Sequence, residues 1–289
     1  IHVKNLLKMI PTNNIYLCDK SQEVLQNVSM EYNIKNIYTD EMNLITNPYI
    51  NSIIICSPPI THFDLIVKCI NADKNLLIEK PIATRIDDLN KIQLLVETKP
   101  ELIVMDCSAR HSVLQPKFDF IKSLISDKDF GQLYYIHHNS VNRQKRPGVE
   151  YHPSAKWFID KNISGGGPFI DWGVYDLAFH IGILNRRPEL LNFRSYFYNG
   201  LDSISREKDF SVEEHAIAMM EFDNLNYYYE RSTNAHNYSK NETRIYSSKM
   251  GLKFNYLFAE DNKVQIFRNS SDGVYSEEEV EVSAVNYNG

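Results

Sequence analysis

The chain has 289 residues, a formal net charge of −6 and a composition that is 43% hydrophobic, 24% charged and 12% aromatic. These values are typical of a globular protein with one large or two medium domains, and they exclude disordered, collagen-like and disulfide-scaffold proteins. The sequence has neither a basic stripe nor an apolar run of membrane-spanning length, so we expect neither nucleic acid nor a membrane as a partner.

In the first hundred residues strand and helix signals alternate, with short connectors between them. Ser21 and Asp40 are expected to cap the two helices that follow them. Strands are expected at 14–19, 37–38, 51–57, 75–78 and 102–107, and helices after Ser21, after Asp40, at 62–72 and at 86–96. This alternation is typical of a doubly wound parallel α/β sheet of the Rossmann type.

The beginning of this pattern is incomplete. Residues 2–9 resemble the tail of a helix with no strand before it, and the first of the 11 glycines is Gly131. A P-loop or an intact dinucleotide fingerprint is therefore excluded from residues 1–130. We expect the chain, which begins with Ile1, to start inside the first helix of a nucleotide-binding domain whose first strand and glycine-rich turn lie upstream.

From about residue 112 the pattern changes to strands without intervening helices. Helices are expected at 113–125 and 168–184, and strands at 132–141, 192–198, 215–222, 227–231, 243–246, 252–256 and 263–267. Such a run of strands predicts an α+β domain with a large, mostly antiparallel open sheet. The expected domains are 1–108, which binds a dinucleotide, and 109–289, which binds substrate and mediates oligomerisation.

The four cysteines are widely spaced and form no CxxC pair. Three of them lie in or beside apolar runs, which favours reduced core thiols in a cytoplasmic protein. The front of the chain shows no signal-peptide pattern.

Three groups of polar residues follow expected strands, where α/β sheets bind their ligands. Asp19 after the first strand can bind an adenosine ribose, or it can simply cap a helix. The segment 57–62, Ser-Pro-Pro-Ile-Thr-His, can form a rigid ligand loop or an ordinary strand-to-helix turn. Lys80 lies in Glu79-Lys80-Pro81, where a cis peptide bond would fix its direction, or it is an exposed turn lysine.

A fourth group surrounds a glycine run at 165–167, which lets backbone or a ligand approach the start of a helix closely. Asp171 and Tyr175 are four residues apart and are expected to share one face of that helix. Beside a lysine they would form a proton-transfer set, although a buried tyrosine that satisfies an aspartate is an equal alternative.

In this order and with these separations, the four groups resemble the Gfo/Idh/MocA family of oxidoreductases, over nearly the whole chain. The resemblance implies a Rossmann domain, a sheet domain whose open face mediates assembly into a homodimer or homotetramer, and NAD(P)-dependent chemistry on sugars, polyols or related hydroxy compounds. It implies cofactor contacts from Asp19, Ser57, Pro58, His62, Glu79 and Lys80.

The resemblance also implies a catalytic set. Lys80 and Asp171 match the family's lysine and aspartate, and Tyr175 stands where the commonest pattern has histidine, as in the glucose–fructose oxidoreductase and dihydrodiol dehydrogenase branch. Hydride would pass to or from nicotinamide while Tyr175 exchanges the proton, with its pKa lowered by Lys80. Asp171 would orient the substrate hydroxyl or the phenol, and Lys156 and Trp157 are candidates for the substrate wall.

Several alternatives stay open. A dinucleotide-sensing regulator and a biliverdin-reductase-like enzyme share the expected fold. Asp176 and His180 could meet on one helical face and, with His152, bind zinc, but they form no compact ligand motif, so we expect no metal. Arg110-His111 lies near the cleft or in a surface turn. The aromatic runs 193–198 and 227–229 favour sheet packing or an oligomer face. Asp19 favours NAD over NADP, and the neighbouring Lys20 weakens that preference.

Overall fold

The computed structural model describes residues 1–142, 156–196, 210–233, 235, 239–257, 261–269 and 272–283. The chain divides into two compact units. The first comprises Ile1–Ile55, Phe63–Ile78 and Asn90–Met105, and the second Cys56–His62, Glu79–Leu89 and Asp106–Gly289. The loops that follow the third and fourth strands thus group with the second unit. The expected domains 1–108 and 109–289 stay a prediction.

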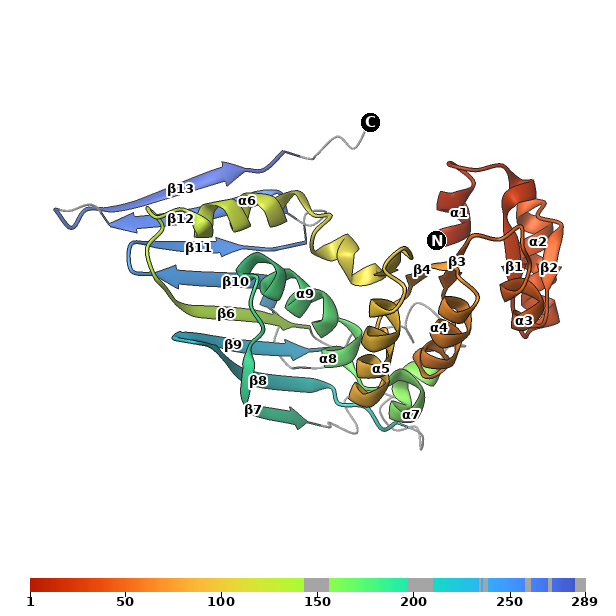
Figure 1. Cartoon of the computed structure of the whole chain (residues 1–289). Coiled ribbons are helices and arrows are strands. Elements are labelled where there is room, and N and C mark those ends of the chain that lie inside the picture. Colours follow the sequence, from red (N-terminus) through yellow and green to blue (C-terminus); the bar gives the residue numbers. More distant parts are fainter. Residues whose placement is uncertain are drawn as a thin grey trace. The chain divides into compact units, whose positions relative to one another are not determined.

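The first unit is a Rossmann-like α/β arrangement, as the alternating pattern predicts (Figure 1). Its strands are all parallel and form two small sheets, β1-β2 and β3-β4-β5. The strands are β1 (Tyr16–Cys18), β2 (Asn36–Tyr38), β3 (Ser52–Ile55), β4 (Asn75–Ile78) and β5 (Val104–Asp106). The helices are α1 (His2–Leu6), α2 (Gln22–Tyr32), α3 (Glu41–Ile45), α4 (His62–Asn71) and α5 (Ile86–Glu97), with short 3₁₀ turns η1 (Thr12–Asn14) and η2 (Pro59–Thr61).

Two of these helices begin at the predicted caps. The Ser21 hydroxyl accepts a hydrogen bond from the Val24 amide at 3.3 Å, and the Asp40 carboxylate accepts one from the Met42 amide at 2.7 Å. Each cap satisfies an amide that has no partner inside its helix. Aliphatic side chains fill the interior of this unit, among them Leu25, Ile34, Ile45, Ile55, Ile66, Ile70, Leu76, Ile78 and Ile92.

The second unit contains an eight-stranded sheet in the order β13-β12-β11-β10-β6-β9-β8-β7. Its ladders are antiparallel except for the parallel pair β6 and β9, which confirms a mostly antiparallel sheet. The strands are β6 (Leu133–Val141), β7 (Glu189–Tyr196), β8 (His215–Phe222), β9 (Leu225–Ser232), β10 (Ser239–Ser247), β11 (Met250–Phe254), β12 (Lys263–Asn269) and β13 (Tyr275–Glu281).

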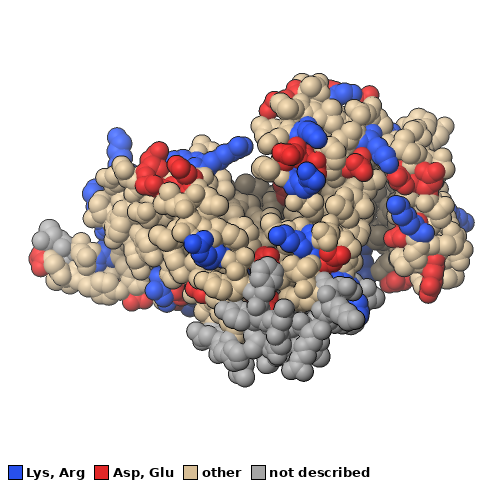
Figure 2. Space-filling model, turned by 90° about the horizontal axis from the view of Figure 1, so that it is seen from below, with Lys and Arg blue, Asp and Glu red and all other residues tan. Residues whose placement is uncertain are grey.

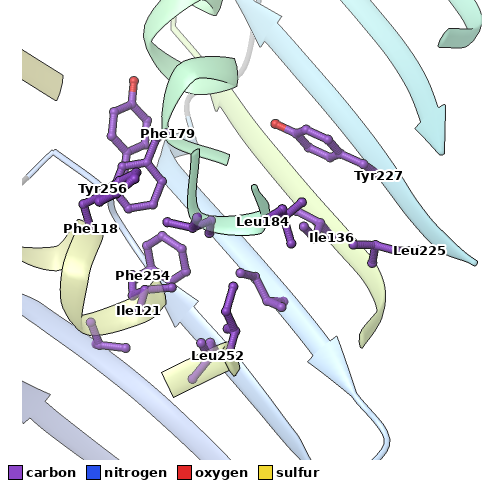
Figure 3. Packing of buried hydrophobic residues seen from close by; sticks show 14 of the residues in the cluster. Phe118, Ile121, Ile136, Phe179, Leu184, Leu225, Tyr227, Leu252, Phe254 and Tyr256 are labelled. Carbon is purple, nitrogen blue, oxygen red and sulfur yellow. The ribbon is translucent and has the colours of Figure 1, made fainter. Parts of the chain in front are cut away.

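Helices α6 (Pro116–Ser126) and α9 (Gly173–Leu184) cover one face of this sheet (Figure 1). Figure 3 shows Phe118 and Ile121 of α6 and Phe179 of α9 packed over side chains from the strands. This apolar layer is the core of the second unit. Helix α9 packs against the sheet, and the residues that it buries include Tyr175 and Asp176.

The sequence missed β13 and placed other boundaries wrongly. β13 carries four glutamates and little apolar character, so it has no alternating pattern; it forms the edge of the sheet, where charged side chains discourage further pairing. Helix α6 begins at Pro116 and not at residue 113, because proline favours the first turn of a helix. The predicted strand 192–198 runs partly into residues outside those described.

The cysteine prediction is correct in part. All four cysteines are free, and Cys69 and Cys107 are buried. Cys18 and Cys56 are exposed, so they are not core thiols. Each lies at the carboxyl end of a strand, where the chain leaves the sheet.

The distribution of charge and the hydropathy of the helices can be described for part of the molecule. On the face shown in Figure 2, basic and acidic side chains are interspersed, and neither sign forms a continuous patch. Among the described residues, none of the helices combines the length and the hydropathy that crossing a bilayer requires.

Candidate active site

Lys80 and Asp171 form an ion pair within the second unit. The Lys80–Pro81 peptide bond is cis, as the proline suggested. The ammonium of Lys80 donates to the carboxylate of Asp171 and also to the Asp171 backbone carbonyl, the latter at 2.6 Å. Both side chains are mostly buried. The structure therefore brings together two of the three predicted catalytic residues, which lie 91 positions apart in the sequence.

Asp171 and Tyr175 do not share one helix, so this expectation is wrong. The predicted helix 168–184 is divided into α8 (Pro168–Asp171) and α9 (Gly173–Leu184). At the junction the Tyr175 amide donates to the Trp172 carbonyl at 2.9 Å, three residues back, in place of the Asp171 carbonyl, four residues back. The break leaves the Asp171 carbonyl to accept a hydrogen bond from Lys80.

Gly173 admits a side chain from the sheet at this junction because it has none of its own. A Cβ atom at Gly173 would lie 2.9 Å from the Tyr229 hydroxyl, closer than packed atoms approach one another. The tyrosine of strand β9 thus occupies the space next to the junction of the two helices.

Tyr175 is the third predicted catalytic residue, and it lies beside the ion pair. Its ring is 1% exposed and contacts the edge of the His111 ring, with the ring centres 4.7 Å apart. Lys80 Nζ lies 5.2 Å from the centre of the ring, and the guanidinium carbon of Arg110 also lies 5.2 Å from it. The Tyr175 hydroxyl accepts a hydrogen bond from Arg110.

The pKa of Tyr175 is raised above its usual value, so the expected lowering by Lys80 is wrong. Burial is the main cause, because the charged phenolate loses its hydration, and Arg110 opposes it. Lys80 directs its hydrogen bonds to Asp171, and the Arg110 guanidinium is the cation that bonds to the phenol. At neutral pH the Tyr175 phenol therefore keeps its proton.

His62 connects the two loops that follow β3 and β4. Its ring is fully buried, with Nδ1 at 2.8 Å from the Pro81 carbonyl and Nε2 at 2.8 Å from the Ser57 carbonyl. The Ser57 hydroxyl in turn lies 2.6 Å from the Thr61 hydroxyl. These bonds hold together two loops at the carboxyl ends of neighbouring strands, the edge at which parallel sheets commonly bind ligands. The ring of His62 braces the loops and is not exposed to a ligand.

Asp19 lies directly after β1, as predicted. Its carboxylate accepts a hydrogen bond from the Ser21 amide at 2.8 Å, and its own amide donates to the Tyr38 carbonyl at 3.2 Å. The residue is exposed. One carboxylate oxygen thus stabilises the turn into α2.

The glycine run at 165–167 makes room for Glu213. A Cβ atom at Gly167 would lie 1.9 Å from the Glu213 carbonyl oxygen, so this position admits only glycine. The Glu213 carboxylate accepts hydrogen bonds from the amides of Gly167 at 2.8 Å and Phe169 at 3.2 Å. The sequence left open whether backbone or a ligand approaches the start of this helix. In the structure the backbone carbonyl and the carboxylate of Glu213 lie at the start of α8.

The two residues expected to form a substrate wall, Lys156 and Trp157, do not border the hollow next to Asp171. Lys156 is exposed, and the Trp157 ring stacks on the Phe158 ring with their centres 3.8 Å apart. The side chain nearer to the site is Phe158, which lines a small hollow next to Asp171. The hollow is bordered by Phe158, Ile159, Gly166, Gly167, Pro168, Asp171, Val212, Glu213 and Thr233.

Asp176, the residue that follows Tyr175 in α9, is the centre of a buried polar cluster. Its carboxylate accepts bonds from Arg231 at 2.6 and 2.9 Å, from Tyr229 at 2.8 Å and from Tyr256 at 2.5 Å. Burial alone would raise the pKa of Asp176, but Arg231 holds it well below its usual range. The Arg231 guanidinium also lies 5.5 Å from the centre of the Trp172 ring, which connects the cluster to the α8–α9 junction.

His180 belongs to the same interior and lies close to Asp176, as expected; Asp176 opposes the lowering of the His180 pKa by burial. Its ring nitrogens lie 2.8 Å from the Tyr227 hydroxyl and 2.9 Å from the Thr243 hydroxyl. Tyr227 and Tyr229 thus serve as core packing, in agreement with the aromatic pattern. In the zinc alternative His180 would be a ligand, but both of its ring nitrogens make these hydrogen bonds. The other histidine of that alternative, His152, lies outside the described residues.

The stability of the second unit should fall as the pH is lowered through about 6.5. Burial lowers the pKa of His111 to about 4 and lowers that of His180 well below its usual value. Both rings stay neutral in the folded state and take up protons on unfolding, so each costs up to about 1.4 kcal/mol per pH unit below the unfolded pKa. Urea unfolding at pH 7.5 and pH 5 measures the loss. His111→Phe should reduce it, and equal midpoints at the two pH values would contradict the prediction.

Three residues of this region were not assigned roles from the sequence. Arg110 lies in the turn that follows β5, so the strand-end rule that selected Lys80 could have selected it as well. Glu213 and Arg231 carry no local signal, because their partners are 46 and 55 positions away.

The chain is similar in sequence to known oxidoreductases. Residues 2–106 match a family model described as an oxidoreductase family with an NAD-binding Rossmann fold, and residues 118–253 match the GFO/IDH/MocA C-terminal domain. The trans-1,2-dihydrobenzene-1,2-diol dehydrogenase of Xenopus tropicalis is 26% identical over 206 residues, which cover 70% of this chain and 59% of that protein. The myo-inositol 2-dehydrogenase of Thermotoga maritima is 23% identical over 177 residues, which cover 61% of this chain and 48% of that protein.

The chain thus spans about half to three-fifths of the length of these relatives. Among solved structures, a levoglucosan dehydrogenase in complex with NADH and levoglucosan superposes with a TM-score of 0.77 at 15% identity, covering 93% of this chain and 71% of that one. At this identity the superposition shows a shared fold. Together the two family models cover most of the sequence, and the chain belongs to the Gfo/Idh/MocA family of oxidoreductases.

Proposed function

We propose that this chain acts as an NAD(P)-dependent oxidoreductase on a secondary alcohol or carbonyl of a sugar, polyol or related hydroxy compound. The observation that carries the proposal is the meeting of an ammonium, a carboxylate and a phenol: Lys80 bonds to Asp171, and its ammonium lies 5.2 Å from the centre of the Tyr175 ring. Sugar and polyol chemistry is supported by the relatives, which are named for a dihydrodiol, for inositol and for levoglucosan.

The residues divide the acid–base work among them. The nicotinamide would supply or accept the hydride. In the reduction direction Tyr175 donates its proton to the substrate oxygen, and the bonded Arg110 guanidinium opposes the effect of burial on the phenol. Lys80 polarises that oxygen, and Asp171 holds Lys80 and orients a substrate hydroxyl.

The cofactor would be held at strand ends. Asp19 would bind the adenosine ribose, and its carboxylate favours NAD over NADP, with Lys20 acting against that preference. Ser57, Pro58, Glu79 and Lys80 lie in the two loops that His62 braces, and these would border the nicotinamide end. Residues 1–130 contain no glycine, so they offer no glycine-rich phosphate loop.

We also propose that the open face of the eight-stranded sheet joins copies of the chain into a homodimer or homotetramer. That face carries a group of aromatic rings: Tyr135 stacks on Tyr246 at 5.6 Å between centres, and His137 lies 5.2 Å from Tyr228. Aromatic residues are enriched at interfaces. A solution mass equal to one chain would contradict this assembly. A cytoplasmic location is part of the proposal and rests on the four free cysteines.

The activity can be tested with the full-length protein by following NADH and NADPH absorbance at 340 nm across a panel of sugars, polyols and their keto forms. We expect substrate-dependent turnover with at least one polyol-like compound, and loss of that turnover in Lys80→Met. Tight dinucleotide binding without turnover of any compound would favour the sensing alternative. Turnover of a tetrapyrrole alone would favour the biliverdin-reductase-like alternative.

A further inference from the structure

Arg110 lies in a braced turn at the end of β5. The turn is the 3₁₀ helix η3 (Cys107–His111), whose first residues are capped by the Asp106 carboxylate, a 2.6 Å acceptor for the Ser108 amide. The Arg110 carbonyl accepts a hydrogen bond from the Gln115 side chain. The backbone that carries the guanidinium is therefore fixed on both sides of the residue.

The guanidinium makes the more direct contact of the two cations beside Tyr175. Arg110 donates from Nη2 to the Tyr175 hydroxyl, whereas the hydrogen bonds that Lys80 Nζ makes go to Asp171. The other Arg110 nitrogen, Nη1, lies 3.9 Å from the Glu79 carboxylate, and both of those side chains are partly exposed. Such a separated, solvated pair contributes little free energy, so the ion pair with Glu79 does not by itself explain where Arg110 lies.

We propose that Arg110 is the positioning residue for proton transfer by Tyr175: it holds the phenol in place and stabilises the phenolate left after the proton is donated. The inference rests on the proposed function. In the reduction direction the carbonyl carbon gains the hydride, the carbonyl oxygen takes the phenol proton, and the phenolate is later reprotonated from solvent. Arginine stays protonated throughout, so it compensates the phenolate charge without giving up a proton of its own.

The charge balance of the site supports this role. A phenolate buried at the position of Tyr175 has lost its hydration and needs a bonded cation. Lys80 is already neutralised by Asp171, while the Arg110 guanidinium reaches the oxygen itself. The charged and titratable groups around the phenol are Lys80, Glu79, Asp171, Arg110, His111 and, behind it, Asp176.

The kinetic test compares Arg110→Met with Arg110→Lys and with Arg186→Met, which removes another partly exposed arginine from the end of α9. Removing a preorganised donor of this kind lowers kcat by about 100-fold. We expect that loss for Arg110→Met, an unchanged KM for NADH, and recovery of about tenfold or more in Arg110→Lys.

A second measurement does not depend on turnover. With 3,5-difluorotyrosine incorporated at position 175, the ¹⁹F shift reports the protonation of a more acidic phenol in an accessible pH range. The midpoint should rise in Arg110→Met and stay unchanged in Arg186→Met. An unchanged midpoint, or a kcat for Arg110→Met equal to that of Arg186→Met, overturns the role of Arg110. The proposed function is tested separately: if Arg110→Met behaves like Arg186→Met but Tyr175→Phe is inactive, only the role of Arg110 is overturned.

Discussion

Replacing Tyr175 with Phe should lower kcat by about 10²- to 10⁴-fold, the range contributed by a positioned proton donor, while the affinity for NADH stays nearly unchanged. The phenylalanine ring keeps the edge contact with His111 and the contact with Trp172, whose ring centre is 5.5 Å away. The substitution therefore removes the hydroxyl and its bond from Arg110 without emptying the interior.

The measurement is steady-state turnover together with NADH binding by fluorescence, with Tyr49→Phe as the control. Tyr49 is 83% exposed, so loss of its hydroxyl should change neither quantity. Turnover of Tyr175→Phe within about twofold of the unmodified protein would remove Tyr175 from the mechanism. A proportional loss of NADH affinity would instead indicate a structural role for the hydroxyl.

Replacing Asp176 with Ala should reduce the free energy of unfolding by about 3–5 kcal/mol, the usual cost of removing one partner from a buried ion pair. Arg231 would stay buried with an uncompensated charge, and the hydroxyls of Tyr229 and Tyr256 would lose their acceptor. The side chains of Asp176 and Arg231 are 0% and 3% exposed, so water cannot replace the carboxylate.

The matched control is Asp223→Ala, which removes a carboxylate that bonds to Arg186 at 3.1 Å. Both of those side chains are more than half exposed, so the expected loss is at most about 1 kcal/mol. The double variant Asp176→Ala with Arg231→Met should recover part of the stability, because it removes the unpaired charge. Urea unfolding measures all three. Equal losses for Asp176→Ala and Asp223→Ala would show that the buried cluster does not stabilise the second unit.

The local patterns were sufficient to predict most of the elements. Strand β4 and strand β8 were predicted to the residue, and both helix caps, Ser21 and Asp40, were placed correctly. Each of these depends on neighbours within a few positions: apolar alternation or continuity for a strand, and a side-chain acceptor for a helix start. β13 was missed because its residues pair with charged side chains of β12 and face solvent, so burial imposed no pattern on them.

The sequence predicted which residues form the candidate site, but it did not predict the helix break between Asp171 and Tyr175. Lys80, Asp171 and Tyr175 were selected from motif order and do come together. The sequence suggested one continuous helix from residue 168 to 184, because helical periodicity continues through Trp172 and Gly173. At the break Tyr229 of strand β9 approaches Gly173, and no local pattern could report a contact 56 positions away.

The sequence by itself determined the fold class, the strand ends that carry polar residues, and the family to which the chain belongs, since these follow from local periodicity and from motif order. Only the tertiary structure decided which cation meets the phenol. Lys80 and Arg110 lie equally close to the Tyr175 ring, yet the free carbonyl and carboxylate of Asp171 engage the ammonium and leave the hydroxyl to the guanidinium. That choice depends on donor and acceptor positions brought together from three distant segments, which residue spacing along the chain does not encode.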